Sequence, residues 1–369
     1  RATRKFERTL LPRVLDAISD AMALSPQIRD GVEIEYMVAD FRDAFYIIPN
    51  SPLERKYFVV RFRGWYYVML RTTQGSRGAP LTWARTVALI MRLTQSVTGT
   101  TSCLISTYVD DPLVIMVGTR AQRDRLAAMV LAIWSALRLP LALDKASKGP
   151  TTTWTSACFR PVPGGIEVTV KPSIVEETIE MLLDFLQRNY ILRKSLRKCV
   201  GKAQHIASLV PVLRPFLQDL YGALYAQCKS AGADAVWTRQ IREATTWILA
   251  LLQEEPAELK RTFLLDTWRG RGKLVELVLD ASPWGLGGYL VEDWKIVSWF
   301  ACGLDKEEQD ILDFHVADSA AQQIVEALAV LVALRLWKHR WLHSRVNLKV
   351  KSDSISALVL CLDFKTKGK

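Results

Sequence analysis

The chain has 369 residues, half of them hydrophobic, and 49 Lys and Arg against 38 Asp and Glu give a formal net charge of +11. This length allows two or three domains, each with a core of its own. The excess of positive charge favours a polyanion partner, nucleic acid first, with a merely solvated basic surface as the alternative at about even odds. The six cysteines are scattered without a Cys-x-x-Cys pair and there are only four histidines, which argues against a zinc knuckle or a disulfide framework.

No apolar run approaches the roughly 18 residues that indicate a membrane span, and no signal peptide is recognised. The scattered cysteines also fit a reducing compartment. We therefore expect an intracellular protein, cytoplasmic or nuclear, without a membrane partner. The chain begins in a charged stretch and ends in DFKTKGK soon after a strand-like run, and we expect both ends to be cut from something longer.

The pattern of apolar and turn-forming residues predicts the elements of the first half in chain order. They are a strand at 34–39, a hairpin at 55–70, a helix from Pro80, two strands within 103–117, a helix at 120–138 and a hairpin at 153–170. The first hairpin is expected to turn at Arg63 and Gly64. The helix at 120–138 is expected to present one apolar face, made by Leu126, Val130, Ile133 and Leu137.

The second half predicts a change of architecture. Residues 172–255 are helical in pattern, and a basic cluster lies among them at Arg193, Lys194, Arg197, Lys198 and Lys202. This cluster either follows a nucleic acid backbone or is a solvated helix face, at about even odds. From residue 274 strand patterns return, together with a buried helix over 321–341, and we place a domain boundary near 270 at the RGRGK run.

Two adjacent carboxylates, Asp110 and Asp111, lie in the otherwise apolar stretch TYVDDPLVIMVG. Buried charge is costly unless it is paired or binds a metal. Because Pro112 suits a turn or the first residue of a strand, we expect the pair to cap a hairpin, with Asp110 aimed at a site. Asp40 also ends an apolar strand, and if both strands share a sheet, Asp40 and Asp110 can meet around two hard cations such as Mg²⁺. The alternative for Asp40 alone is a helix N-cap.

The stretches VADFRDAFYIIP, QGSRGAP and YVDD, in this order, resemble three successive motifs of the reverse transcriptase palm. The resemblance implies a ferredoxin-like palm sheet with helices, and transfer of nucleotides from dNTPs to an RNA or DNA template-primer. It makes Asp40 and Asp110 catalytic metal ligands, with Asp111 in a weaker metal role. Mg²⁺ is the expected cofactor, two ions in each active site, with Mn²⁺ as an alternative.

The same resemblance assigns residues to substrate binding. Phe45 matches the bulky steric gate that clashes with a ribose 2′-hydroxyl; an ordinary core aromatic is the alternative, and the pattern does not distinguish Phe45 from Tyr46. The other implied contacts are Asp43 and Ala44 with the triphosphate, and Gln74 and Gly75 with the template and incoming nucleotide.

Two lysines compete for one further role. Lys145 resembles the lysine near the leaving pyrophosphate, where it would stabilise charge or act as a general acid. Lys148 is its rival, and a solvated loop lysine is about as good an interpretation. Trp154, in a stretch that resembles the primer-gripping hairpin, either stacks there or packs in the core, which is the favoured alternative. The chain departs from the family pattern at Ala79 and Pro112, and the basic finger strands that hold the triphosphate would lie before its first residue.

Three more carboxylates close or interrupt apolar elements in the C-terminal part. Asp280 ends a strand before a glycine-rich stretch, Glu326 lies on an apolar helix, and Asp353 ends a later strand. A lone Glu in a buried helix is costly unless it has a partner such as a metal, so the three suggest a second two-metal site. They resemble the catalytic, metal-binding Asp, Glu and Asp of the ribonuclease H family. The family's fourth acidic residue would lie beyond the last residue, which implies an incomplete domain.

The predicted class is α/β (α+β), with three domains in the order palm, helical thumb and connection, and ribonuclease H. Their bounds are 1–170 for a fingers remnant and palm, 171–268 for the thumb and connection, and 269–369 for the incomplete ribonuclease H-like domain. This order resembles the Pol region of LTR-type or DIRS-type retrotransposons. It implies an RNA-directed DNA polymerase with linked hydrolysis of RNA in an RNA–DNA hybrid. The alternatives are an inactive or domesticated nucleic-acid-binding fragment, and a DNA-templated repair polymerase, which leaves the C-terminal carboxylates unexplained.

Overall fold

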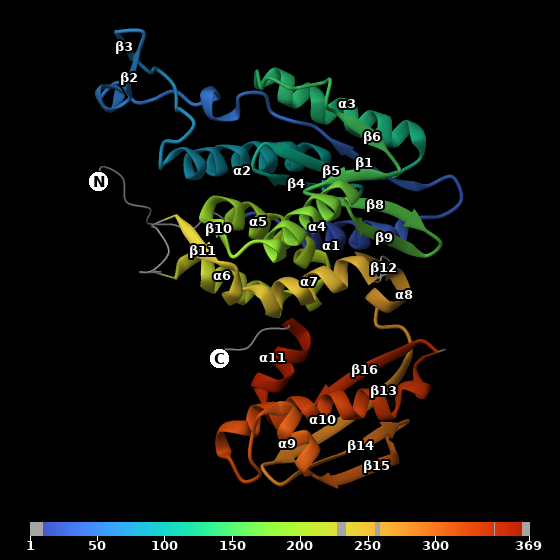
Figure 1. Ribbon diagram of the computed structural model, residues 1–369. Helices are drawn as coiled ribbons and strands as arrows, with labels where there is room; N and C mark the ends of the chain where they lie inside the picture. The colour runs from blue at the N-terminus through green and yellow to red at the C-terminus, as the bar shows by residue number, and fades with distance from the viewer. Residues whose placement is uncertain (1–9, 227–233, 255–258, 343, 364–369) are drawn as a thin grey trace. The chain divides into compact units, whose positions relative to one another are not determined.

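The computed structural model describes residues 10–226, 234–254, 259–342 and 344–363 (Figure 1). Helices and small sheets follow one another along the chain, so the predicted mixed α/β class is confirmed. The chain forms two compact units, one made by 1–174 with 259–263, the other by 175–258 with 264–369. The division into three domains stays a prediction.

A four-stranded antiparallel sheet in the order β4-β5-β1-β6 is the centre of the first unit. Its strands are β1 (Glu33–Val38), β4 (Cys103–Tyr108), β5 (Asp111–Gly118) and β6 (Ser147–Gly149). β5 pairs with β4 on one edge and β1 on the other, and Val114 lies opposite both Ile105 and Met37. All of β5 after its first residue is buried, which explains its nearly unbroken apolar sequence.

Three helices pack against this sheet: α1 (Val14–Leu24), α2 (Ala79–Thr98) and α3 (Arg120–Ala136). Helix α2 has a proline in its first turn, as predicted, and Trp83, Val87, Ile90 and Met91, which recur at helical spacing, are all buried. Thr119 caps α3 in a capping box with Gln122. The side chains of α2 and α3 form one hydrophobic cluster with Met37, Val114 and Met116 of the sheet.

The buried face of α3 agrees with the prediction in part. Predicted Val130 is buried, predicted Leu126 and Ile133 are partly buried against the same cluster, and predicted Leu137 is exposed. The structure also buries Arg123, Ala127 and Trp134, and the ring of Trp134 packs against Phe41 with centroids 5.2 Å apart. Arg123 follows it inward because its guanidinium lies 3.1 Å from the carboxylate of Glu35 on β1.

A separate two-stranded hairpin joins β2 (Val59–Phe62) to β3 (Trp65–Val68). It turns at Arg63 and Gly64, as predicted, and both have positive φ, 49° and 84°, as a two-residue type I′ turn requires. Every residue of the two strands is exposed. In Figure 1 this hairpin projects beyond the helices and strands around it.

A second small sheet has the order β12-β9-β8-β7. It contains β7 (Thr152–Trp154), β8 (Ala157–Val162), β9 (Gly165–Val170) and β12 (Lys260–Leu264). The predicted hairpin at 153–170 is thereby confirmed, and it turns at Pro163 and Gly164, the two residues between β8 and β9. Trp154 is 1% exposed, so its favoured interpretation as a core residue is confirmed.

Helices dominate the first part of the second unit, as predicted. They are α4 (Pro172–Gln187), α5 (Arg193–Leu209), α6 (Arg214–Tyr225) and α7 (Arg242–Glu254), with a short ribbon of β10 (Tyr190–Leu192) and β11 (Ala235–Trp237). The five residues of the basic cluster on α5 differ in their contacts. Arg193 donates to the carbonyls of Leu224 and Ala226, and Lys202 lies 2.6 Å from Glu177, whereas Lys194, Arg197 and Lys198 are exposed.

The C-terminal part is a sheet in the order β15-β14-β13-β16, in which β13 and β16 are parallel. Its strands are β13 (Lys273–Ser282), β14 (Gly285–Glu292), β15 (Lys295–Gly303) and β16 (Val346–Lys351). The helices are α8 (Leu265–Trp268), α9 (Lys306–Leu312), α10 (Gln322–Leu336) and α11 (Ile355–Asp363). Helix α10 packs on β13 and β14. Among the described residues, no helix has both the length and the apolar character that crossing a bilayer demands.

Replacing Arg123 by Ala should destabilise the first unit. Its guanidinium also donates to the Gly118 carbonyl at 2.6 Å, and the substitution leaves that oxygen and the Glu35 carboxylate without this partner. We expect a loss of about 2–4 kcal/mol in the free energy of unfolding, measured by urea denaturation. The control is Arg120→Ala on the same helix, whose side chain is 91% exposed and should contribute less than about 0.5 kcal/mol. Equal losses in the two variants would contradict the role of Arg123.

Candidate active sites

The first site forms at the turn between β4 and β5. Tyr108 pairs with Asp111, which leaves Val109 and Asp110 as the two residues of the turn. Val109 has φ of 57°, a left-handed conformation that is unfavourable for a β-branched residue. The turn therefore needs support from outside itself.

Two buried tryptophans supply that support. The indole N–H of Trp83 on α2 donates to the Val109 carbonyl at 2.7 Å. The indole N–H of Trp154 on β7 donates to the Asp111 carbonyl at 3.0 Å. The sequence favoured a core position for Trp154, and it gave no sign of either bond because each acceptor is far away in the chain. Trp83 is thus a positioning residue that sequence reasoning missed.

Asp40 is fixed beside the same turn through the backbone. The amide of Ala39 donates to the Pro112 carbonyl at 3.2 Å, and the amide of Phe41 donates to the Asp110 carbonyl at 2.9 Å. The backbone carbonyl of Asp40 accepts a hydrogen bond from the amide of Ala142 at 2.9 Å. The structure therefore brings the predicted partners Asp40 and Asp110 together. It also rules out the N-cap alternative for Asp40, since the following 3-10 helix, η2 (Ala44–Ile47), has Asp43 at its N-cap.

The three aspartates repel one another electrostatically. Burial raises the pKa of Asp110, and the charge of Asp40 raises it further while Lys145 opposes the shift. Burial, followed by the charges of Asp110 and Asp40, raises the pKa of Asp111 to about 6. Such coupled shifts are typical of groups gathered to bind a cation or move a proton. In this structure the cation beside Asp40 is Lys145, whose Nζ lies 2.6 Å from Oδ2 of Asp40.

The structure also separates the two rival lysines. Lys145 reaches Asp40, and hydrogen bonding to Asp40 raises the pKa of this lysine. Lys148 lies on β6 and instead contacts Asp124 at 2.6 Å and Glu35 at 2.9 Å. Lys145 is therefore the lysine at the carboxylates.

The predicted substrate-binding residues lie on two segments that flank the exposed hairpin. Asp43 is exposed in the left-handed conformation, Ala44 is buried, and Phe45 is half-buried against the core of the sheet. Tyr46 is exposed, so packing distinguishes the two aromatic residues that the sequence could not. Gln74 and Gly75 are exposed in the loop before α2, where Gly75 has φ of 85°.

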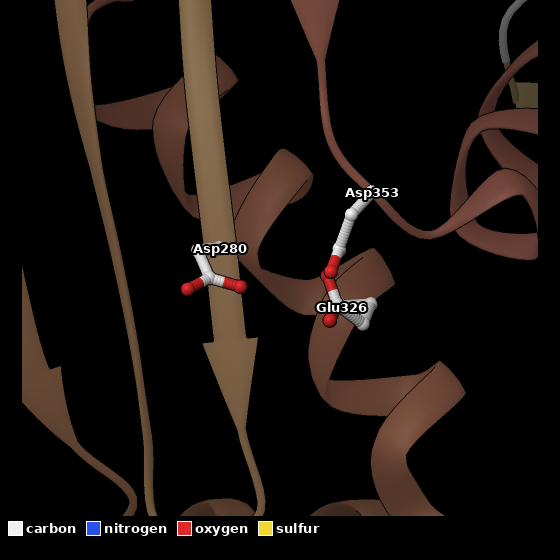
Figure 2. Close-up of side chains that lie close together, drawn as sticks. All are labelled: Asp280, Glu326 and Asp353. Carbon is white, nitrogen blue, oxygen red and sulfur yellow. The ribbon is translucent and has the colours of Figure 1, made fainter.

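The second site gathers Asp280, Glu326 and Asp353 from three different elements. Figure 2 shows their carboxylates facing one another from β13, from α10 and from the segment after β16. One oxygen from each lies within 4.8 Å of the other two. In the described part of the chain this is the one group of three acidic, His or Cys side chains that is so close. The structure thus brings together all three residues predicted for this site.

Glu326 is the buried member of this cluster, with 4% exposure. Burial raises its pKa, and the charges of Asp353 and Asp280 raise it further. Gln322, one helical turn earlier, donates to Glu326 at 2.9 Å and to the Ala281 carbonyl at 2.7 Å. It therefore ties the helix to the strand that carries Asp280.

An open pocket of about 470 Å³ adjoins Asp280, lined by residues 280–282, 285–287 and 301–303. The lack of a side chain at Gly285 lets β14 approach β15 closely at the edge of this pocket, because a Cβ there would lie 2.6 Å from the Cys302 carbonyl. Ser282 donates to the Gly285 carbonyl at 3.3 Å, and Ser354 accepts a bond from the Ala357 amide at 3.3 Å. Both serines therefore cap local turns of the chain.

Comparison with known proteins agrees with the first set of motifs. Residues 3–155 match the family model described as reverse transcriptase (RNA-dependent DNA polymerase). A search of curated proteins finds no match.

Similar solved structures include the foamy viral protease-reverse transcriptase with an RNA/DNA hybrid, at 14% identity and a TM-score of 0.47. A dRH form with double-stranded DNA has 15% identity and a TM-score of 0.47, and another double-stranded DNA complex has 15% and 0.46. The matches cover 98%, 95% and 91% of this chain but only 43%, 55% and 62% of those chains.

The raised pKa of Asp111 predicts that, in the absence of metal, the free energy of unfolding depends on pH. The folded chain binds this proton more tightly than the unfolded chain, so stability should fall as pH rises from about 4 to 6. Asp111→Asn should reduce that fall by about 1–2 kcal/mol, a value already lowered for solvent screening. The measurement is urea denaturation in chelator across this range. Asp124→Asn is the control, because Lys148 lowers the pKa of Asp124 and its titration lies below this range. An unchanged pH slope in Asp111→Asn would show that the carboxyl is not shifted.

Proposed function

Because residues 3–155 belong to the reverse transcriptase family, we propose that the chain is an RNA-directed DNA polymerase. It extends the 3′-hydroxyl of a primer with dNTPs on an RNA or DNA template. The observation that carries this proposal is the convergence of Asp40, Asp110 and Asp111 at one supported turn, with Lys145 beside them. The chain spans 43–62% of the length of the similar solved chains, so the activity is proposed for this chain from its own residues.

The residues at the turn fit a divalent metal. Asp110 and Asp111 both have raised pKa values from burial and mutual charge, and Asp40 already holds a cationic group, the Lys145 ammonium. Asp40 and Asp110 would hold two Mg²⁺ ions, with Asp111 in the weaker role, since carboxylate oxygens are the ligands Mg²⁺ prefers. When bound, such ions activate the attacking hydroxyl and stabilise the leaving oxygen.

The chain's own groups supply the rest of the mechanism. Lys145 can leave Asp40 and place its positive charge, or its proton, at the leaving pyrophosphate. Phe45 packs against the hydrophobic core. Its ring clashes with a ribose 2′-hydroxyl and so selects dNTPs over NTPs. Asp43 and Ala44 offer backbone contacts to the triphosphate, and Gln74 and Gly75 contact the template and incoming nucleotide.

We propose that the C-terminal carboxylates hydrolyse RNA in an RNA–DNA hybrid. The support is the closeness of Asp280, Glu326 and Asp353, three like charges that a divalent metal would stabilise. The pocket beside Asp280 is open, so the strand to be cut can reach it. Together, the two sites favour the Pol region of an LTR-type or DIRS-type retrotransposon as the source of this chain.

A second candidate is a fragment that binds nucleic acid without catalysis. The net charge of +11 favours it, as do the exposed Lys194, Arg197 and Lys198 of α5. Intact carboxylates at both sites favour the catalytic proposal, because a chain that only binds nucleic acid gains nothing from clustered negative charge near a phosphate backbone.

Primer extension tests the polymerase. The chain should extend oligo-dT on poly-rA with Mg²⁺, and Asp110→Asn should lower the rate at least about 100-fold, since one ligand of the metal site is lost. Asp124→Asn is the matched control, an acidic residue of the same unit that pairs with Lys148, and it should extend at the parent rate. Synthesis that survives Asp110→Asn would refute the assignment of the site.

Cleavage of labelled RNA in a hybrid tests the second site. Asp280→Asn should abolish Mg²⁺-dependent cleavage and leave primer extension unchanged. Glu326→Gln should raise the melting temperature without metal, because it removes a buried like charge, and it should remove most of the stabilisation that Mg²⁺ gives the parent. Cleavage that persists in Asp280→Asn, or a Mg²⁺ shift that Glu326→Gln leaves intact, would count against this site.

A further inference from the structure

A pocket of about 580 Å³ lies between α2 and β4, which run side by side in Figure 1. Thr107 of β4 lines this pocket. Successive residues of a strand point to opposite faces, so Tyr108 points the other way, where its ring packs against Trp154 with centroids 6.4 Å apart. The pocket is thus on the side of the β4–β5 turn away from Trp154. Its volume is in the range of small-molecule sites.

Most of the pocket lining is apolar. The large apolar side chains of the lining are Leu10, Leu11, Trp83, Val87, Met91, Ile105 and Val109. Two of them, Leu10 and Leu11, are 91% and 38% exposed. Exposed apolar side chains around a concave site gain from an occupant that removes them from water. The larger part of a matching ligand is therefore apolar.

Two polar groups interrupt this lining. Oγ1 of Thr107 is buried and has no hydrogen-bond partner among the described residues, which is costly for a hydroxyl. Arg92 of α2 also lines the pocket and is exposed. Helix α2 includes Arg85 and Arg92 but no acidic residue, so an anionic group beside Arg92 meets positive charge without a competing carboxylate on the same helix.

Other kinds of occupant match the pocket less well. A nucleic acid strand needs several cations along a groove and rings on which its bases stack, whereas this pocket offers one cation in a mostly aliphatic lining. A symmetric contact between two copies of the chain uses the same patch on both, so it would place one basic α2 helix against another. A small molecule with an apolar body and an anionic group satisfies every part of the lining.

We propose that this pocket binds a small amphiphile, a molecule with an aromatic or aliphatic body and one sulfonate or carboxylate group. The body packs among Leu11, Met91 and Ile105. A polar atom of the body meets the Thr107 hydroxyl, and the anionic group lies beside Arg92.

The pocket also adjoins the turn that carries Asp110, because Trp83 and Val109 both line it. Val109 has a left-handed conformation that the hydrogen bond from Trp83 supports. A ligand that packs against Val109 adds to that support, so the turn is better prepared to bind a divalent metal. By linkage, ligand and metal should each tighten the binding of the other by the same factor. This consequence rests on the proposed function, whereas ligand binding itself does not.

The test is fluorescence titration of the full chain, without divalent metal, with two probes: anilinonaphthalene sulfonate and the uncharged N-phenylnaphthylamine. Ala88 lines the pocket, and Ala88→Trp should weaken both probes at least about tenfold, since the indole and the ligand compete for one volume. Leu89→Ser is the matched control. Leu89 is the next residue of α2, is 55% exposed and lies outside the pocket, so both affinities should stay within about twofold of the parent.

Two further variants test the polar groups. Arg92→Gln should weaken the sulfonate probe about three- to tenfold and leave the uncharged probe unchanged, since only the sulfonate meets the guanidinium. Thr107→Val should raise the melting temperature of the free chain, because it removes a buried hydroxyl without a partner. The same variant should weaken both probes, whose N–H groups the hydroxyl accepts. A variant that is merely destabilised cannot produce both changes.

The decisive outcomes differ for the site and for its linkage to the turn. Unchanged affinities in Ala88→Trp overturn the proposal, as does an equal loss in Leu89→Ser, which would assign the probes to the outer surface of α2. Mg²⁺ should tighten binding of the uncharged probe to the parent and have no effect in Asp110→Asn. Pocket binding that Mg²⁺ leaves unaltered would overturn the linkage. Parent protein that binds the probes through the pocket but fails to extend a primer would count against the proposed function and support the ligand site.

Discussion

Mutual repulsion among closely placed carboxylates governs both sites. A turn that carries Asp110 and Asp111 beside Asp40 stores unfavourable charge, which raises the pKa values of the turn aspartates. The fold tolerates this because the turn is fixed independently of its charges. Two indole N–H groups, from Trp83 and Trp154, bond its carbonyls, and the amides on either side of Asp40 bond the same hairpin.

The two sites balance that repulsion in different ways. At the first, a long lysine side chain supplies the countercharge, and Lys145 can withdraw from Asp40 because it is largely exposed. At the second site, neutral hydrogen-bond donors stabilise the negative charge, since Gln322 and Ser352 both donate to the carboxylate of Glu326. In the described part of the chain no basic side chain is found within 4.0 Å of those three carboxylates. The first site thus has an exposed lysine as its countercharge, whereas the second is a cluster of negative charge whose three carboxylates lie close enough to hold a metal ion.

Packing arguments explain where local patterns were misleading. The helix at 120–138 packs Leu126, Val130 and Ile133 against the core as its pattern indicates, but it exposes Leu137 and also buries Arg123 and Trp134. Burial of a tryptophan removes more apolar area from water than burial of a leucine, and an acidic partner on β1 receives the arginine. The β2–β3 hairpin is the converse case: its turn and strands follow the local pattern closely, but no described element covers its rings.

The sequence by itself determined β1, β4 and β5, the two hairpins of the first unit and the start of α2, because strand alternation, positive φ at glycine and proline at a helix start are local properties. It did not predict the short strands β6, β10, β11 and β12, which form only where a distant segment pairs with them. It also identified every carboxylate of the two clusters, since a charge at the end of an apolar strand or within an apolar helix is visible without any partner. Only the tertiary structure decided which groups meet. Lys145 reaches Asp40 across 105 residues while Lys148 turns to Asp124 and Glu35, and Phe45 packs inward while Tyr46 does not. Such choices depend on contacts between distant segments, which sequence periodicity does not encode.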